Sequence, residues 1–210
     1  MTALREYPGT AVAPTLVLAH GAGAGHDHPW MTRVARGLAD RGVRVVTFNF
    51  PYIEEKRKVP DRGPVLEDAF AAVWRDVVSA AAGLLFAGGK SMGGRIASQL
   101  AARGAFDPAP AGLVFFGYPL HPPGKPGQRR DRHLASIDAP LLFLHGTRDP
   151  FGSPDEMRGL VAGLPRATLE LIDGGDHSLV APKRQDPESA SLERAIGLAA
   201  AFMRASPQGP

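Results

Sequence analysis

The chain has 210 residues, with 24 Lys and Arg against 21 Asp and Glu, and no cysteine. This length fits one domain over residues 1–210, and a net charge of +3 is too small to indicate a nucleic-acid partner. The lack of cysteine excludes disulfides, thiolate metal sites and a cysteine nucleophile, and no apolar run reaches the ~18 residues needed to span a bilayer. We expect a cytoplasmic protein.

Short apolar runs bounded by Gly and Pro recur along the chain, and this pattern predicts strands buried on both faces of a parallel sheet. These runs are residues 15–19, 43–48, 84–87, 113–116, 141–145 and 168–172, with room for one edge strand at 4–7. Between them, apolar residues at helical spacing predict helices around residues 31–38, 66–77, 92–100, 154 onward and 192–203. The alternation predicts an α/β fold with six or seven mostly parallel strands and helices on both faces.

Two segments are predicted to be irregular. Residues 117–136 hold four prolines and four Lys or Arg residues, and residues 206–210 are expected to form a frayed tail. A loop as long as the first is usually functional or mobile. Arg129 and Arg132 in this loop either bind an acidic group of a substrate or are simply solvated. Tyr52, after the strand at 43–48, is expected to line a substrate pocket.

The glycine-rich stretch FAGGKSMGGRIA, residues 86–97, fits two functional motifs. A phosphate-binding loop ending in Gly-Lys-Ser requires another glycine at position 84, where the chain has Leu84 inside a predicted strand. The alternative is a nucleophile elbow, Gly-x-Ser-x-Gly, which holds Ser91 on a tight turn between a strand and a helix. The strand before and the helix after this stretch favour the elbow.

A serine nucleophile needs a base, and the base needs an acid that orients it. The strand at 141–145 leads to Asp149, and the strand at 168–172 leads to His177. The order Ser91, Asp149, His177 is the order of this triad in proteins with a nucleophile elbow. Because the carboxyl ends of parallel strands meet at one edge of a sheet, we expect the three side chains to converge there.

Other acidic and basic residues near these motifs have simpler interpretations. Asp155 is explained as a charge in the first turn of a helix that begins with a capping box of Ser153 and Glu156. Asp176 is too close in sequence to His177 to orient its ring, so a turn role is expected. The His-Asp-His run at 26–28 lacks a third ligand at convincing spacing, so no metal site is predicted.

Three further side chains are expected to be structural. His20 is expected to brace the glycine-rich loop that follows it, and His145 is expected to act similarly at the end of its strand. Lys90 precedes the nucleophile, and its side chain is expected to point away from the face of attack.

An oxyanion hole requires backbone N–H groups aimed at the developing charge. The stretch LAHGAGAGHDHP directly follows the strand at 15–19, and its small residues let the backbone approach a substrate closely. We expect the N–H of Ala22 and the N–H of Met92 to form this hole. Removal of one such donor typically lowers turnover by about 10²–10³-fold.

Six stretches together carry a resemblance to a known family: LAHGAGAG, FNFPY, GGKSMGGR, GYPLHPPGKP, HGTRDPFG and GGDHS. The chain resembles the α/β-hydrolase superfamily over nearly its whole length. It is most similar to a small branch without a cap domain, which includes predicted bacterial hydrolases related to dienelactone hydrolases and the hydrolase-like subunit of the NSL histone acetyltransferase complex. The resemblance implies the same triad, although dienelactone hydrolases generally carry cysteine where this chain has Ser91.

These observations predict a serine hydrolase that cleaves a small carboxylic ester through an acyl-enzyme, with thioesters or amides as the next choice. The reaction needs no cofactor. Without a cap domain, we expect a shallow pocket. The partner is then a small molecule, and nothing in the sequence indicates a nucleic acid or a membrane. The alternative is a non-catalytic interaction module on a hydrolase scaffold, because fold alone does not fix function.

Overall fold

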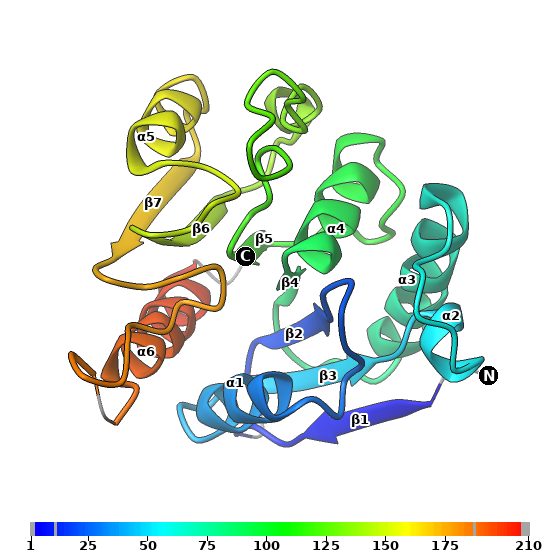
Figure 1. The fold of residues 1–210 in the computed structure, drawn as a ribbon. Coiled ribbons are helices and arrows are strands. Elements are labelled where there is room, and N and C mark those ends of the chain that lie inside the picture. The colour runs from blue at the N-terminus through cyan, green and yellow to red at the C-terminus, as the bar shows by residue number, and fades with distance from the viewer. Residues whose placement is uncertain (1–2, 11, 187, 207–210) are drawn as a thin grey trace.

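The computed structural model describes residues 3–10, 12–186 and 188–206. Of the tail expected at 206–210, only Ser206 lies within the described residues. A seven-stranded sheet forms the centre of the molecule, in the order β1-β3-β2-β4-β5-β6-β7 (Figure 1). The strands are β1 (Leu4–Tyr7), β2 (Thr15–Ala19), β3 (Arg44–Phe48), β4 (Leu85–Lys90), β5 (Gly112–Phe116), β6 (Leu141–Gly146) and β7 (Ala167–Ile172).

The helices alternate with these strands, as the sequence predicted. They are α1 (Pro29–Ala39), α2 (Pro51–Glu54), α3 (Gly63–Val78), α4 (Met92–Ala102), α5 (Pro154–Ala162), α6 (Ala190–Ala205) and the short 3₁₀ helix η1 (Leu134–Ser136). The short α2 was not expected. The capping box at the start of α5 is confirmed, because Ser153 and Glu156 bond reciprocally to each other's backbone N–H groups.

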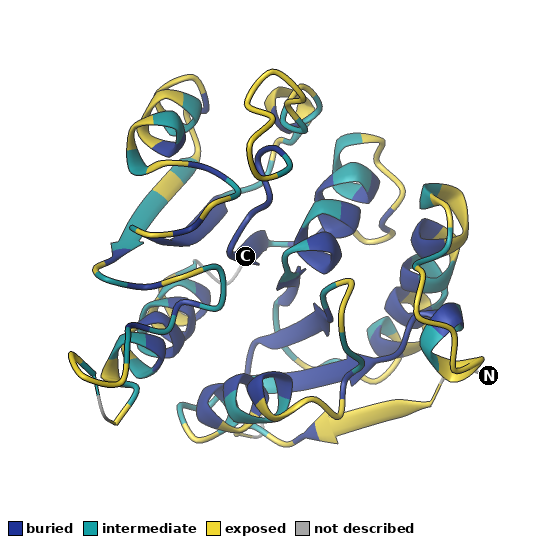
Figure 2. Cartoon of the chain, viewed as in Figure 1, coloured by how far each residue is buried: buried dark blue, intermediate teal, exposed yellow. Residues whose placement is uncertain are grey.

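All neighbouring strands pair in parallel except β1, which runs antiparallel to β3 at one edge. Figure 2 shows the central strands buried and β1 mostly exposed. The expectation of burial on both faces fails for β7, where only Ile172 is buried. The physical reason is its position at the other edge of the sheet, where it has one neighbouring strand.

Helices cover both faces of the sheet. Successive strand residues point to opposite faces, so Val17 of β2 joins one core and Leu18 joins the other. The first core includes apolar side chains of α3, α4 and α5, and the second includes those of α1 and α6. None of the helices in the described part of the chain is both long and apolar enough to cross a membrane.

The strand that precedes the glycine-rich turn is longer than predicted. It continues through Gly88 and Gly89 to Lys90, and these glycines pair with β5 in the parallel ladder. The turn is therefore confined to the junction with α4, which begins at Met92. The loops that follow β2, β4, β6 and β7 all leave the same edge of the sheet, because these strands are parallel. This edge carries the candidate site.

Candidate active site

Ser91 occupies a strained position at the tip of the turn between β4 and α4. Its φ of 50° and ψ of −115° lie in a region that residues other than glycine rarely adopt. A Cβ on Gly89 would lie 2.6 Å from the carbonyl carbon of Gly93, and a Cβ on Gly93 would lie 2.5 Å from the carbonyl oxygen of Ala19. The turn therefore requires glycine at both positions.

His177 and Asp149 are in direct contact, although they follow different strands. Nδ1 of His177 lies 2.8 Å from Oδ2 of Asp149, whose carboxylate is fully buried. The other carboxylate oxygen accepts the N–H of Phe151 at 2.9 Å. Because an ionised carboxylate only accepts hydrogen bonds, Nδ1 of the neutral ring carries the proton and Nε2 carries the lone pair. Nε2 is buried and has no hydrogen-bond partner among the described residues.

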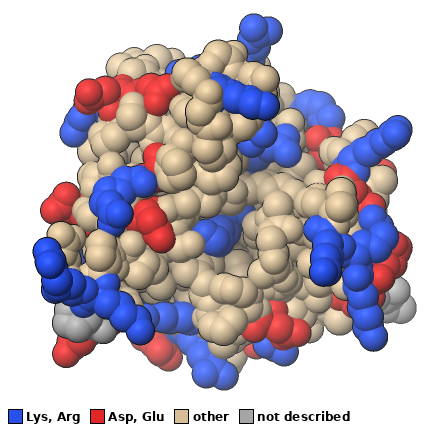
Figure 3. Space-filling model, viewed as in Figure 1, with Lys and Arg blue, Asp and Glu red and all other residues tan. Residues whose placement is uncertain are grey.

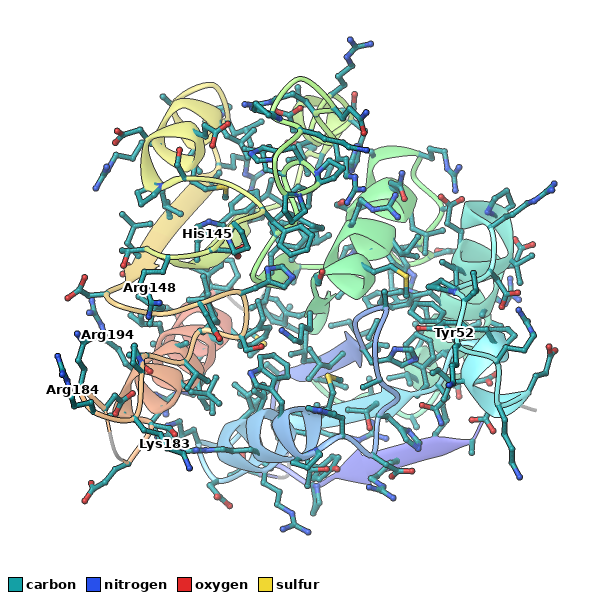
Figure 4. All side chains as sticks on the ribbon, viewed as in Figure 1. Tyr52, His145, Arg148, Lys183, Arg184 and Arg194 are labelled. Carbon is teal, nitrogen blue, oxygen red and sulfur yellow. The ribbon has the colours of Figure 1, made fainter. Side chains whose placement is uncertain are left out.

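Packing fixes the plane of the His177 ring. The Phe151 ring stacks on the imidazole with centroids 4.1 Å apart and an interplanar angle of 28°. The turn that carries Phe151 is in turn held by His145, whose ring contacts the carbonyl oxygen of Gly152 through Nε2 at 2.8 Å. Figure 4 shows His145 beside β6. The bracing role predicted for His145 is confirmed.

Asp176 and Asp155, the other two acidic residues considered from the sequence, do not bond to the His177 ring. Asp176 accepts the N–H of Ser178 at 2.7 Å and that of Val180 at 3.2 Å, so its predicted role in a turn is confirmed. Asp155 is exposed on α5 and pairs with Arg158 at 2.6 Å.

The loop after β2 lies directly against the nucleophile turn. A Cβ on Gly21 would be 3.7 Å from the Cβ of Ser91, so the space between this loop and the serine would just hold a methyl group. Ala22 follows in this loop and lines the same cavity as Ser91. Met92 is the first residue of α4, and its N–H is among the four that a helix leaves without an internal partner. The two residues expected to form an oxyanion hole therefore lie on the two segments that flank Ser91.

The buried side chain of His20 holds the loop after β2 in place. Nε2 of His20 accepts the N–H of Phe50 at 3.0 Å, so Nδ1 donates to the carbonyl oxygen of Gly21 at 2.7 Å. The predicted brace is thus confirmed. Burial is the main cause that lowers the pKa of His20 to about 4, which keeps its ring neutral.

Tyr52 does not line the pocket, which corrects the sequence prediction. Its ring is fully buried, and its hydroxyl donates to the carbonyl oxygens of Ala22 at 3.1 Å and Gly21 at 3.3 Å. The reason is that α2 turns its first residues toward the core, where Phe50 packs edge-on against Phe48. Figure 4 shows Tyr52 beside α2 and away from the strand ends that carry His145. Tyr52 therefore holds the loop after β2 through these two hydrogen bonds from the core.

The turn and the two loops enclose one open cavity of about 370 Å³. Its lining residues are Gly21, Ala22, Gly23, Ala24, His28, Met31, Lys90, Ser91, Phe151, His177 and Ser178. Ser91 and His177 face this shared space, and Asp149 sits behind the histidine ring. In Figure 3 the cavity's side of the molecule is hollowed at its centre.

Lys90 also lines the cavity, contrary to the expectation that it points away. Its Nζ donates to the carbonyl oxygen of His177 at 3.1 Å and to Oγ of Ser178 at 3.0 Å, and it lies 4.8 Å from the centroid of the Trp30 ring. Lys90 keeps the alternation of β4, because Phe86 and the Trp30 ring that Nζ contacts belong to the same core. The sequence could not show how far its long side chain extends from that face toward the loop after β7.

The His-Asp-His run does not gather metal ligands. Among the described residues, no group of three or more His, Asp and Glu is arranged to hold a metal ion. His28 instead caps α1, because its Nδ1 accepts the N–H of Trp30 at 3.2 Å.

Comparison with known proteins identifies the family of this fold. A family model described as an alpha/beta hydrolase domain matches residues 12–204. The chain belongs to the α/β-hydrolase family.

Solved α/β hydrolases share the fold at low sequence identity. A dienelactone hydrolase from Anabaena variabilis has a TM-score of 0.73 and 17% identity, covering 96% of this chain and 90% of its own. An α/β serine hydrolase without a lid, from Xanthomonas campestris, has a TM-score of 0.71 and 22% identity, covering 99% of this chain and 91% of its own. Est1E from Butyrivibrio proteoclasticus, solved with ferulic acid, has a TM-score of 0.73 and 14% identity, covering 98% and 96%.

The elements in the described part of this α/β hydrolase include no cap domain. The long segment at 117–136 is held by a bond within itself, from the Tyr118 hydroxyl to the carbonyl oxygen of Arg130 at 2.7 Å. It also contacts α4, where Nε2 of His133 lies 2.8 Å from Oγ of Ser98. Neither Arg129 nor Arg132 is among the residues that line the cavity. Arg129 pairs with Asp131, two residues away, which satisfies its guanidinium locally.

Proposed function

We propose that this α/β hydrolase is a serine hydrolase that cleaves small carboxylic esters through an acyl-enzyme. One observation carries the proposal. A buried carboxylate fixes the proton of His177 on Nδ1, and the unpaired Nε2 belongs to a ring that shares a cavity with the strained Ser91. An imidazole in this tautomer is a general base for a hydroxyl within its reach.

In the proposed reaction, Oγ of Ser91 attacks the ester carbonyl and its proton passes to Nε2 of His177. Asp149 stabilises the resulting imidazolium, and the N–H groups of Ala22 and Met92 stabilise the oxyanion. The C–O bond to the alcohol then breaks, and the alcohol leaves with the proton from Nε2. Water then attacks the acyl-enzyme as His177 takes its proton, the bond between the acyl carbon and Oγ of Ser91 breaks, and Nε2 returns the proton to Oγ, which releases the acid and the free serine.

The substrate class follows from the cavity and from relatives. A cavity of about 370 Å³, lined largely by small residues, accommodates a small acyl group. Structural neighbours named as an esterase domain from Rhodothermus marinus and as a monoacylglycerol lipase from Paleococcus ferrophilus support an ester substrate. Thioesters and amides follow esters in the order of preference.

The test is covalent labelling of the pure protein with a fluorophosphonate, which reacts only with an activated serine. We expect labelling of the wild type and none of Ser91→Ala. The chain supplies a matched control in Ser98, a second serine in contact with a histidine. Ser98 is fully buried and donates to the carbonyl oxygen of Arg95 at 2.7 Å, so Ser98→Ala should label like the wild type. Labelling that does not depend on Ser91, or no labelling, would favour a non-catalytic interaction module.

A further inference from the structure

The ionisable side chains that line the cavity are all basic. They are His28, Lys90 and His177, and no Asp or Glu is among the described residues of the lining. Figure 3 shows a basic side chain at the bottom of the central hollow, with neutral surface around it. A small cavity with this lining is electrostatically suited to a negatively charged ligand.

Lys90 is the one Lys or Arg in the described lining, and its ammonium group has no carboxylate partner there. Its two hydrogen-bond acceptors, the carbonyl oxygen of His177 and the hydroxyl of Ser178, are both neutral. None of the ion pairs formed by the described residues involves Lys90. An ammonium has three N–H donors, and besides these two hydrogen bonds Nζ contacts only the neutral face of the Trp30 ring, at 4.8 Å from its centroid.

Partial burial makes the positive charge of Lys90 less favourable but does not remove it. Burial lowers the pKa of Lys90 to about 8, and the fields of Asp176 and Asp149 oppose the shift. The side chain therefore remains mostly protonated at neutral pH. A partly buried cation without a counter-ion is stabilised when an anion arrives, because the anion replaces lost hydration.

His28 adds a second donor at the same cavity. The N–H of Trp30 donates to its Nδ1, so the neutral ring carries its proton on Nε2. The exposed arginines of the loop at 117–136 do not line the cavity, so an acidic group bound inside it would contact Lys90 or His28 and not these arginines.

We propose that the preferred substrates are esters that carry a free carboxylate, and that Lys90 is the residue that selects them. This inference rests on the proposed function, since it names the substrate class of the same site. Lys90 and Ser91 line the same cavity, and the ammonium group contacts the loop that carries His177, so a carboxylate on a short chain would reach it while the ester carbonyl lies at the serine.

The test compares two matched pairs of esters. The first pair places the charge on the acyl part: the 4-nitrophenyl monoester of adipic acid against 4-nitrophenyl hexanoate. The second pair places it on the alcohol part: 4-acetoxybenzoate against 4-acetoxybenzamide. In at least one pair, we expect the wild type to prefer the anion by about tenfold in kcat/KM, a typical effect for a charge-assisted hydrogen bond.

The variant Lys90→Met keeps the apolar stem and removes the charge. We expect it to lose the preference for the anion, mainly through a higher KM. Lys90→Arg should retain part of the preference, and Arg129→Gln, which removes an exposed cation outside the cavity, should retain all of it. Each ratio is measured within one variant, so any general loss of activity cancels.

Two results would overturn the proposal. One is a wild type that hydrolyses the neutral ester of each pair as well as the anionic one. The other is a Lys90→Met variant that loses activity equally on the anionic and the neutral esters. That result would mean that the lysine only holds the His177 loop. Neither result affects the proposed ester hydrolysis, which is judged separately by Ser91-dependent turnover of the neutral esters.

Discussion

Asp149 lies 2.8 Å from His177 through Oδ2 and Nδ1, and the phenyl ring of Phe151 covers the same imidazole. The contact joins the loop after β6 to the loop after β7. It fixes both the direction of the ring and the nitrogen that carries the proton.

We predict that Asp149→Asn lowers kcat by about 10⁴-fold without unfolding the protein, because an amide can donate to Nδ1 and reverse the tautomer. Steady-state hydrolysis of 4-nitrophenyl acetate measures this loss. Asp155→Asn makes the same change on the exposed surface of α5 and should leave kcat unaltered. Equal activity of the two variants would remove Asp149 from the proposed mechanism.

Replacing Tyr52 tests whether this residue holds the loop after β2 or contacts the substrate directly. Tyr52→Phe removes a hydroxyl that bonds to the carbonyl oxygens of Gly21 and Ala22. We expect kcat to fall about tenfold with little change in KM, since Tyr52 is not among the residues that line the cavity. A larger KM with unchanged kcat would return Tyr52 to the substrate pocket.

Tyr7 is the matched control for stability. Its hydroxyl is buried without a hydrogen-bond partner among the described residues, so its removal should not lower the free energy of unfolding. Tyr52→Phe should lower that free energy by about 1 kcal/mol, as is usual for a lost hydrogen bond. Urea denaturation of both variants provides the comparison.

Gly→Ala substitutions in the nucleophile turn and on α5 should have opposite effects on stability. Gly93→Ala places a Cβ 2.5 Å from the carbonyl oxygen of Ala19, so we expect a loss of stability of about 3 kcal/mol or more, together with loss of fluorophosphonate labelling. Gly159→Ala on α5 meets no atom within 4 Å and should gain up to about 1 kcal/mol from better helix propensity. Thermal unfolding of both variants and the wild type measures these changes in stability. A Gly93→Ala variant as stable as the wild type would contradict the tight packing of this turn.

His20 predicts how stability depends on pH. Burial lowers its pKa from 6.5 to about 4, so the unfolded chain binds this proton more readily than the folded protein does. Its contribution is therefore present above about pH 6.5 and is lost as the pH falls toward about 4. Between about pH 7 and about pH 5, the free energy of unfolding should fall by about 2 kcal/mol from this group.

The measurement is urea unfolding of the wild type and His20→Gln at both pH values. Gln at this position does not titrate, so the variant should lose less stability than the wild type over the same range. Parallel losses in the two proteins would mean that His20 is not held neutral in the folded state.

The sequence alone determined which elements form and where the candidate site lies. Buried apolar runs alternate with helical segments, and this alternation leads to a parallel sheet whose strands all end at one edge. Ser91, Asp149 and His177 each follow such a strand, so their convergence depends on topology and on little else. The need for glycine at 89 and 93 could also be read from the sequence, because a strand meets a helix at that point.

The tertiary structure alone decided where the side chains around the site point. Tyr52 follows a strand and Lys90 is the last residue of one, yet Tyr52 turns into the core and Lys90 reaches the cavity, the reverse of what the sequence suggested. Tyr52 lies beyond the strand periodicity that assigns faces. For Lys90 that periodicity assigns the face but not the position of the ammonium group, so both positions depend on neighbours far away in the chain. For Tyr52 these neighbours are the backbone carbonyls of Gly21 and Ala22, and for Lys90 they are the loop of His177 and the ring of Trp30.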